Sequence, residues 1–128
     1  MNRLEIADYT GEFVSIKIED YENTIQISFF GEIDMQDPES LFLPYFENIH
    51  QKIVDDCINE VVLNFQNLNF LNSSGIKVII KWIQIALILP EEKKYKFKIL
   101  ASSKVPWQAN SLKLLSMLSQ KLIEIIVI

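Results

Sequence analysis

Glycine, cysteine and histidine are scarce in this chain of 128 residues. Its three glycines, Gly11, Gly31 and Gly75, are too far apart to form the glycine-rich loops that cradle nucleotide phosphates, so nucleotide hydrolysis and dehydrogenase chemistry have no support. A single cysteine, Cys57, excludes an internal disulfide, and the lone His50 has no second histidine with which to share a metal ion. We therefore predict no cofactor, no metal site and no catalytic residue.

Basic residues are outnumbered as well. Lys and Arg total 12 against 17 Asp and Glu, which leaves a net charge of -5. Nucleic-acid-binding proteins usually gather Lys and Arg on one face, so this balance argues against a DNA or RNA partner. The longest apolar stretch, residues 76–89, is too short to span a bilayer and contains Lys77 and Lys81. Residues 1–5 precede no apolar stretch of a signal peptide, and we expect a cytoplasmic protein without membrane insertion.

The length and the hydrophobic content of 49% suit one folded domain over residues 1–128. Apolar residues alternate with polar ones over residues 14–18, and the alternation resumes over residues 25–29 after a polar stretch at residues 20–23. Such a period of two is typical of strands. The sequence therefore predicts an antiparallel hairpin that opens the domain, and Gly31 ends its pattern.

A helix is predicted next, because Asp37 followed by Pro38 combines a capping carboxylate with a proline suited to the first helical turn. Apolar residues then recur at steps of three or four, which predicts one buried face: Phe42, Phe46, Ile49, Ile53 and Cys57. Pro44 lies inside the pattern, so we expect the first turn to be separate or kinked and the regular helix to begin near Pro44. The thiol of Cys57 is expected to be buried.

The second half alternates strands with helices. A nearly continuous apolar run at residues 61–65 predicts a parallel strand that is covered on both faces. We expect a helix over about residues 73–88, a strand over 95–99, a helix that opens at Pro106, and a last strand over 123–128. The order β-β-α-β-α-β-α-β predicts an α/β fold: a mixed, mostly parallel sheet of about five strands with an N-terminal antiparallel hairpin, packed with three to four helices.

The tetrapeptide Asn-Ser-Ser-Gly at residues 72–75 lies where the buried strand gives way to the second helix. Free N–H groups and the positive end of the helix dipole favour a bound or covalent anion at such a place. A simpler interpretation is that Ser73 caps its helix and Gly75 lets the chain pack closely, and from the residues alone this is the more common situation.

Other candidate groups give weaker evidence of a functional site. The carboxylates of Glu32, Asp34 and Asp37 could imitate an acid–base pair, but a solvated loop and a helix cap explain them more simply. Cys57 lacks a histidine that would activate it as a nucleophile, and His50 is expected to be an ordinary surface or boundary residue. We therefore predict that the protein is not an enzyme.

The segment at residues 61–76 resembles the signature of the STAS domain family, which includes anti-sigma factor antagonists and the cytoplasmic domains of sulfate transporters. That signature is a buried strand, a short polar loop, and Asp-Ser-Ser-Gly or Asp-Ser-Thr-Gly opening a helix. Residues 31–34, Gly-Glu-Ile-Asp, are similar to the Gly-Glu-Leu-Asp found at the end of the second strand in that family. The chain is most similar to small stand-alone bacterial regulators, related to phosphoproteins that control diguanylate cyclases, which carry Asn before the hydroxyl residues; residues 37–39 and 106–112 fit that subgroup too.

This resemblance implies the STAS (SpoIIAA-like) fold and a signalling protein that exchanges partners when phosphorylated. In antagonists of this type the first hydroxyl residue after the Asp accepts phosphate from a serine kinase, which corresponds to Ser73, with Ser74 as a secondary acceptor. The sequence departs from the family pattern at Asn72, where the carboxylate is missing. The implied partner-binding surface comprises Glu32, Asp34, Asn72, Ser73, Ser74, Gly75 and Lys77.

The partners implied by the resemblance are a serine kinase that is an anti-sigma factor of the histidine-kinase-like ATPase type, and a phosphatase. Two alternatives stay open: phosphorylation-controlled regulation of a diguanylate cyclase, and an unphosphorylated scaffold subunit of a lipid-transport complex. Whether the chain forms a homodimer is not decided by the sequence.

Overall fold

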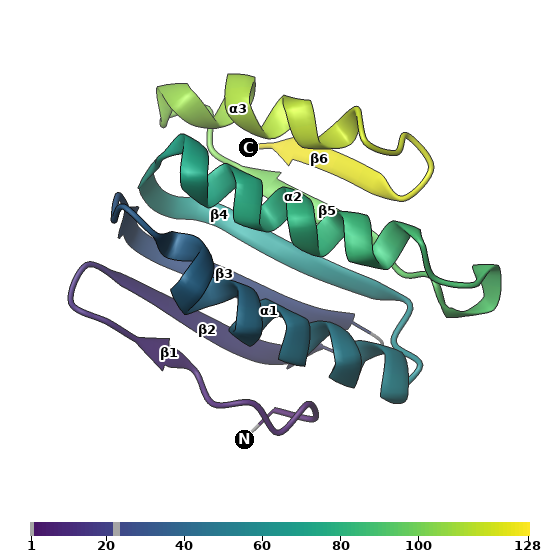
Figure 1. Ribbon diagram of the computed structural model, residues 1–128. Coiled ribbons are helices and arrows are strands. Elements are labelled where there is room, and N and C mark those ends of the chain that lie inside the picture. Colours follow the sequence, from purple (N-terminus) through teal and green to yellow (C-terminus); the bar gives the residue numbers. More distant parts are fainter. Residues whose placement is uncertain (1, 22–23) are drawn as a thin grey trace.

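A six-stranded sheet covered on one face by three α-helices makes up the structure (Figure 1). The computed structural model describes residues 2–21 and 24–128, without the side chain of Ala109. Part of the predicted hairpin turn, residues 22 and 23, lies outside the described residues. The elements are β1 (Tyr9–Thr10), β2 (Val14–Tyr21), β3 (Thr24–Ile33), α1 (Pro38–Asp55), β4 (Glu60–Leu71), α2 (Ser73–Leu87), the 3-10 turn η1 (Glu91–Lys93), β5 (Lys96–Ala101), α3 (Pro106–Ser116) and β6 (Ile123–Val127).

The strands lie side by side in the order of the sequence, from β1 to β6. β2 is antiparallel to both of its neighbours, β1 and β3, whereas β3, β4, β5 and β6 are parallel to one another. A helix connects each parallel pair, and right-handed crossovers that all step in one direction place every helix on the same face. This arrangement confirms the predicted α/β order and adds the two-residue β1 and the turn η1.

The core lies between the helices and the sheet. Alternate residues of β3, Ile25, Ile27 and Phe29, are completely buried, as the period of two requires. On the helix side, the ring of Phe46 in α1 stacks on Trp82 in α2, with centroids 4.9 Å apart. Trp82 in turn meets Phe97 of β5 edge-on at 5.6 Å. Aromatic packing therefore joins both helices to the sheet.

A buried polar trio lies within this core, and it corrects the prediction for His50. The Tyr95 hydroxyl accepts a hydrogen bond from Trp82 Nε1 at 2.9 Å and lies 2.7 Å from His50 Nδ1. Burial raises the pKa of Tyr95 well above its usual range, so the hydroxyl keeps its proton, and it can donate a hydrogen bond to His50 Nδ1 when the imidazole carries its own proton on Nε2. His50 is buried and is not a surface or boundary residue.

Two predictions about α1 are wrong. The helix runs unbroken from Pro38 to Asp55, with Pro44 inside it. Pro44 has no N–H to donate to the carbonyl of Ser40, four residues earlier. Both residues are exposed, so this carbonyl is close to solvent. Cys57 is exposed rather than buried, because the helix has already ended and the chain turns there with a φ of 54°. The series of apolar residues spaced by three or four thus extends to Cys57, although the helix ends at Asp55.

The strand before the Asn-Ser-Ser-Gly segment is longer than predicted. β4 continues through residues 66–71, where the sequence suggested a short polar loop. The second half of β3 pairs with this extension, which places Ile33 opposite Leu71, across two irregularities in the register. Backbone pairing to a neighbouring strand thus extends a segment whose side chains do not form one apolar run.

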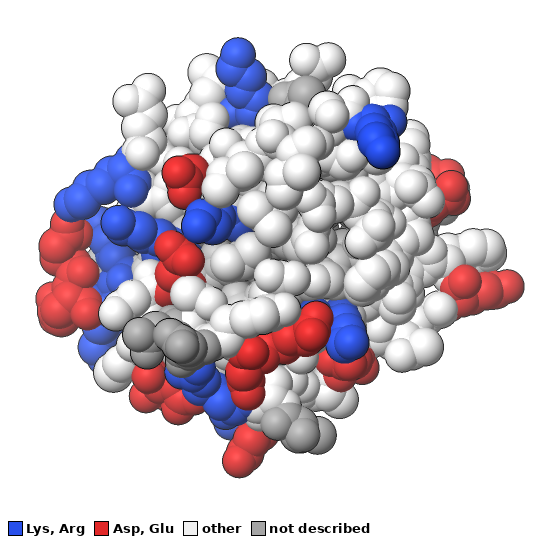
Figure 2. All heavy atoms as spheres, turned by 180° about the vertical axis from the view of Figure 1, so that it is seen from behind, with Lys and Arg blue, Asp and Glu red and all other residues white. Residues whose placement is uncertain are grey.

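None of the helices in the described residues covers the other face of the sheet. Figure 2 shows this face, where charged side chains gather at the left of the view and around the rim, and a broad uncharged area lies between them. Residues that alternate with the core supply that face, among them Ser28, Phe30, Asn64, Gln66, Leu100 and Ile126.

Candidate functional site

The start of α2 is held by Asn72, which occupies the N-cap position with extended backbone angles (φ -74°, ψ 170°). Its Oδ1 accepts a hydrogen bond from the Gly75 backbone N–H at 2.7 Å. Its carbonyl accepts from the N–H of Ile76 at 3.1 Å. The capping residue is therefore Asn72 and not Ser73, which lies one position further on, at the first residue of the helix.

Asn72 also ties the helix to the chain after β3. Its side-chain Nδ2 donates to the Met35 carbonyl at 2.9 Å, and its backbone N–H donates to the Ile33 carbonyl at 3.0 Å. A carboxylate could accept from Gly75 but could not donate to Met35. Asparagine at position 72 can therefore form both hydrogen bonds, whereas an ionised aspartate could form only the one to Gly75.

With Asn72 as the cap, the hydroxyl of Ser73 is free to serve another purpose. Ser73 is exposed and Ser74 is half-buried. Among residues 2–21 and 24–128, the Ser73 side chain has no hydrogen-bond partner, and neither do the backbone N–H groups of Ser73 and Ser74. An exposed hydroxyl thus lies beside two unsatisfied N–H donors at the positive end of a helix dipole.

Gly75 is needed for close packing at this corner. It is buried, and an added Cβ would lie 2.5 Å from Leu71 Cδ1 and 3.1 Å from Ile33 Cγ2. Gly31, in the segment that precedes the other half of the site, is more constrained. Its φ is +97°, and an added Cβ would lie 2.1 Å from the Phe13 carbonyl oxygen.

Glu32 and Asp34 lie at the same edge of the sheet as Asn72. Glu32 pairs with Phe70 in the ladder between β3 and β4, and Asp34 follows directly after β3. Both are exposed. They line a hollow of about 260 Å³ together with Phe13 and Met35. The structure therefore brings two carboxylates and apolar surface next to the start of α2.

Lys77 completes the predicted set. It is exposed and lies four residues after Ser73, which places the two side chains on neighbouring turns of one helix face. Within the described part of the chain, Lys77 forms no ion pair, whereas Lys81, one turn further along, pairs with Glu39 of α1. Among the described residues, Lys77 is thus a cation without an ion-pair partner one helical turn from Ser73.

Sequence reasoning missed three apolar residues of this edge. Phe13 is 68% exposed, Phe70 is 42% exposed, and Met35 lines the hollow. Phe13 precedes its strand and Phe70 lies in the extension of β4, so neither carried a periodic signal. Only the pairing between β3 and β4 shows that Phe70 lies beside Glu32.

The first turn of α3 supports β4 below the site. The Gln108 side chain is completely buried, and its Nε2 donates to the carbonyls of Phe65 and Leu68 at 2.5 and 3.0 Å. Its Oε1 accepts from the N–H of Ser102 at 2.6 Å. Trp107 Nε1 donates to the Asn69 carbonyl at 2.9 Å. These bonds satisfy backbone carbonyls that the irregular part of β4 leaves unpaired.

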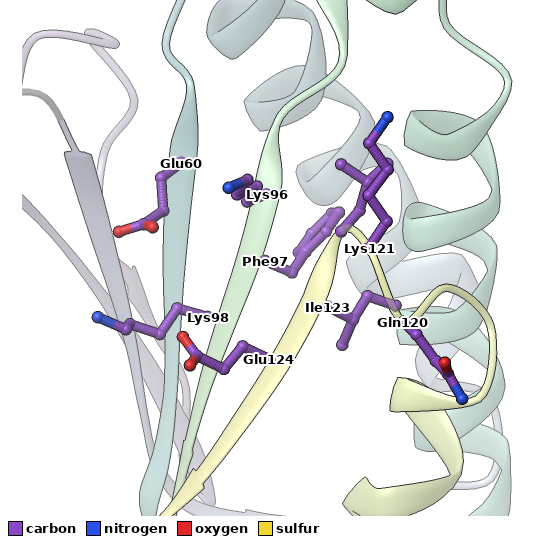
Figure 3. A pocket seen from close by; sticks show the side chains of 9 residues that line it. Glu60, Lys96, Phe97, Lys98, Gln120, Lys121, Ile123 and Glu124 are labelled. Atoms are coloured by element: carbon purple, nitrogen blue, oxygen red, sulfur yellow. The ribbon is translucent and has the colours of Figure 1, made fainter.

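A second hollow, of about 330 Å³, lies at the opposite edge of the sheet, where the parallel strands begin (Figure 3). Lys96, Lys98 and Lys121 line it with Glu60 and Glu124. β4 runs from this edge to the start of α2, a distance of roughly 35 Å for a strand of its length. This hollow is therefore separate from the serines.

Asp37 has a structural role rather than a place in the site. Hydrogen bonds from the Ser40 side chain and N–H lower the pKa of Asp37, which caps α1 as the sequence predicts. In the described residues, no cluster of His, Cys, Asp and Glu side chains has the arrangement to hold a metal ion. None of the described helices combines the length and apolar character needed to cross a membrane.

Comparison with solved structures supports the fold. An anti-sigma factor antagonist from Mycobacterium paratuberculosis superposes with a TM-score of 0.57 and 22% identity, over 86% of this chain and 86% of that one. The phosphorylated form of the Bacillus cell fate determinant SpoIIAA superposes with a TM-score of 0.51 and 14% identity, over 87% of this chain and 90% of that one. No protein-family model matches the sequence, and no curated protein sequence does either. The structural matches confirm that the chain has the fold of anti-sigma factor antagonists, as the resemblance predicted.

Proposed function

We propose that the protein is a non-enzymatic partner-switching regulator, and that phosphorylation of Ser73 controls its binding to a protein partner. The observation that carries this proposal is the free, exposed Ser73 hydroxyl beside two unpaired N–H groups at the start of α2. Support also comes from the fold shared with two anti-sigma factor antagonists, one of them solved in a phosphorylated form. The proposed kinase is an anti-sigma factor of the histidine-kinase-like ATPase type, with a phosphatase that reverses the reaction.

The helix start can tolerate a phosphate. The group adds about -1.5 to -2 charges at pH 7, and the helix dipole, the free N–H groups and the Lys77 ammonium all favour that charge. Asn72 contributes no negative charge of its own, and its two hydrogen bonds use its own amide rather than the Ser73 hydroxyl. We therefore expect the fold to persist after phosphorylation.

The binding surface is expected to respond differently. Unmodified protein would dock through the start of α2, with Glu32 and Asp34 on the rim. A phosphate at Ser73 adds negative charge beside these two carboxylates, and a packed interface without a matching cation would have to desolvate it. A loss of about 3 kcal/mol weakens binding by about two orders of magnitude, which is enough for a switch.

Intact mass after incubation with ATP and an extract of the source cells tests this function. We expect a gain of one phosphate in the wild type and in Ser74→Ala, and no gain in Ser73→Ala. Fragment spectra should place the group on Ser73. Absence of phosphate from the wild type, or an equal gain in both variants, would contradict the proposal and favour an unphosphorylated scaffold.

Partner capture separates sigma-factor control from the cyclase alternative. Immobilised wild-type protein should retain an ATPase of the histidine-kinase type rather than a diguanylate cyclase. Ser73→Asp should retain less of it and Ser73→Ala as much as the wild type. Capture of a cyclase with the same dependence on Ser73 would keep the switch and change its target.

A further inference from the structure

β6 is an unprotected edge of the sheet. It is the last strand in the order, and Figure 1 shows it at the end of the sheet opposite β1. β1 has only two residues, but β6 has five, Ile-Glu-Ile-Ile-Val. Natural edge strands are usually blunted by shortness, Lys, Pro or a bulge. β6 contains neither Lys nor Pro, and its described register with β5 is uninterrupted from Ile123 to Val127.

Backbone groups of β6 point away from the sheet. The N–H of Ile128 donates to Ala101, and its carbonyl accepts from Ser103. In a parallel ladder alternate residues bond to the same neighbour, so Glu124 and Ile126 also face β5. Both backbone groups of Ile125 and Val127 therefore face outward, which leaves two N–H donors and two carbonyl acceptors for another strand.

The side chains along this edge are apolar. Val127 is 51% exposed. The helix that packs on β5 and β6, α3, exposes Leu114 to 57% and Met117 to 76%. Glu124 is the single charged residue within β6. A strand placed beside β6 would thus meet apolar side chains of β6 itself.

We propose that β6 pairs antiparallel with β6 of a second copy of this chain, so that one sheet continues across a twofold symmetric dimer. In the register that uses all four free groups, Ile125 lies opposite Val127 of the second copy, and Ile126 lies opposite its own counterpart. Such an interface is self-complementary, as a twofold dimer requires. It also covers the exposed edge.

Neighbouring registers are less favourable. If Ile125 faced Ile125 of the second copy, pairing would require the N–H of Ile123, which already donates to the Ser119 carbonyl at 3.1 Å. If Ile125 faced Ile123, the two Glu124 carboxylates would lie directly opposite each other, which destabilises a strand pair. Backbone groups and charge therefore select the same register, and this self-complementarity is what commits the edge to a second copy.

Sedimentation equilibrium of the full chain, from about 1 μM to about 1 mM, tests the dimer. We expect a concentration-dependent species of twice 14.9 kDa. Val127→Lys should raise the dissociation constant at least about tenfold, because it places a lysine on the edge. The matched control is Ile88→Lys, since Ile88 is 83% exposed at the end of α2, away from β6, and that dimer should equal the wild type.

A wild type that stays monomeric over this range would overturn the proposal and leave an extended segment of another protein as the occupant. Equal weakening by both lysine variants would also overturn it. Circular dichroism of each variant should match the wild type, which excludes unfolding as the cause.

Cross-linking tests the register. In a Cys57→Ser background, Ile126→Cys would place two thiols in a non-hydrogen-bonded antiparallel pair with Cα atoms about 4.5 Å apart, within the range of a disulfide. Mild oxidation should give a covalent dimer. Glu124→Cys on the same face would lie about 13 Å from its counterpart and should remain monomeric. Failure of Ile126→Cys to cross-link, or equal cross-linking of both variants, would contradict the register.

Discussion

The side-chain amide of Asn72 donates to the carbonyl oxygen of Met35 across 2.9 Å, and so joins the start of α2 to the chain that follows β3. The same side chain caps its own helix through the Gly75 N–H. These two bonds need a donor and an acceptor in one short side chain, which asparagine has and ionised aspartate lacks. The contacts of Asn72 thus explain why this chain has asparagine where the STAS signature that it resembles has aspartate.

Asn72→Asp should therefore destabilise the protein. The variant keeps the cap, but it loses a hydrogen bond and sets a carboxylate against the Met35 carbonyl, and we expect a loss of about 1–3 kcal/mol in the free energy of unfolding at pH 7. Urea denaturation measures this loss. At about pH 3 the protonated side chain can donate again, so the deficit relative to wild type should shrink.

Asn72→Ser separates the loss of the hydrogen bond to Met35 from the introduction of a negative charge. Serine retains capping ability without a charge but lacks the amide donor, so its loss of stability should not shrink at low pH. An Asn72→Asp variant as stable as the wild type at pH 7 would show that the bond to Met35 contributes nothing.

The two glycines of the site should differ in how they tolerate alanine. Gly31→Ala forces a side chain onto a residue with φ of +97° and toward a backbone oxygen, and we expect a loss of about 3 kcal/mol. Gly75→Ala meets mainly the end of the Leu71 side chain, which can move, so its loss should be smaller. Chemical denaturation of both variants gives the ranking, and the reverse order would contradict the geometry.

Stability should depend on pH through His50. Burial lowers the pKa of His50, an effect that the Glu47 carboxylate partly opposes. Because the unfolded chain binds the proton more readily, with a pKa near 6.5, the contribution of His50 is complete above about pH 6.5 and is lost as the pH falls toward the lower folded value. His50→Gln should flatten the unfolding free energy across that window, and superimposable pH curves for variant and wild type would contradict this.

Tyr95→Phe tests the trio from the other side. Removal of the hydroxyl leaves Trp82 Nε1 and His50 Nδ1 without their shared partner in the core. We expect a loss of about 2 kcal/mol at pH 7, measured by urea denaturation. A neutral effect would show that the buried groups find other partners.

Phosphate on Ser73 should leave the fold intact. Protein carrying phosphoserine at residue 73 is expected to unfold within about 1 kcal/mol of the unmodified protein and to be the more stable of the two at low salt, because the dipole and Lys77 favour the charge. The gain should fall at high ionic strength and in Lys77→Gln. Clear destabilisation by the phosphate would mean that the helix start cannot accommodate it.

Much of this architecture follows from local pattern. The alternation in β2 and β3, the Asp37-Pro38 helix start and the apolar run of β4 each correspond to observed elements. Glu32 and Asp34 lie at the same edge of the sheet as the start of α2 because the carboxyl ends of adjacent parallel strands share one edge. The secondary-structure elements and their order can thus be predicted from the spacing of apolar residues, the helix-capping residues and the rules for connecting parallel strands.

Long-range partners explain what the pattern could not show. His50 is buried because Tyr95, 45 residues away, supplies its hydrogen bond. The extension of β4 depends on the second half of β3, and the burial of Gln108 depends on carbonyls of β4. The choice of Asn72 over Ser73 as the cap rests on its bond to Met35. None of these contacts can be predicted from the spacing of apolar residues in the sequence.

Ser73 as the control point is tested most directly by the affinity of a captured partner for unmodified protein and for protein with phosphoserine installed at residue 73. We predict an increase in the dissociation constant of at least about tenfold on phosphorylation, with phosphoserine at residue 74 as the positional control. Equal dissociation constants for the unmodified and Ser73-phosphorylated proteins would contradict the account.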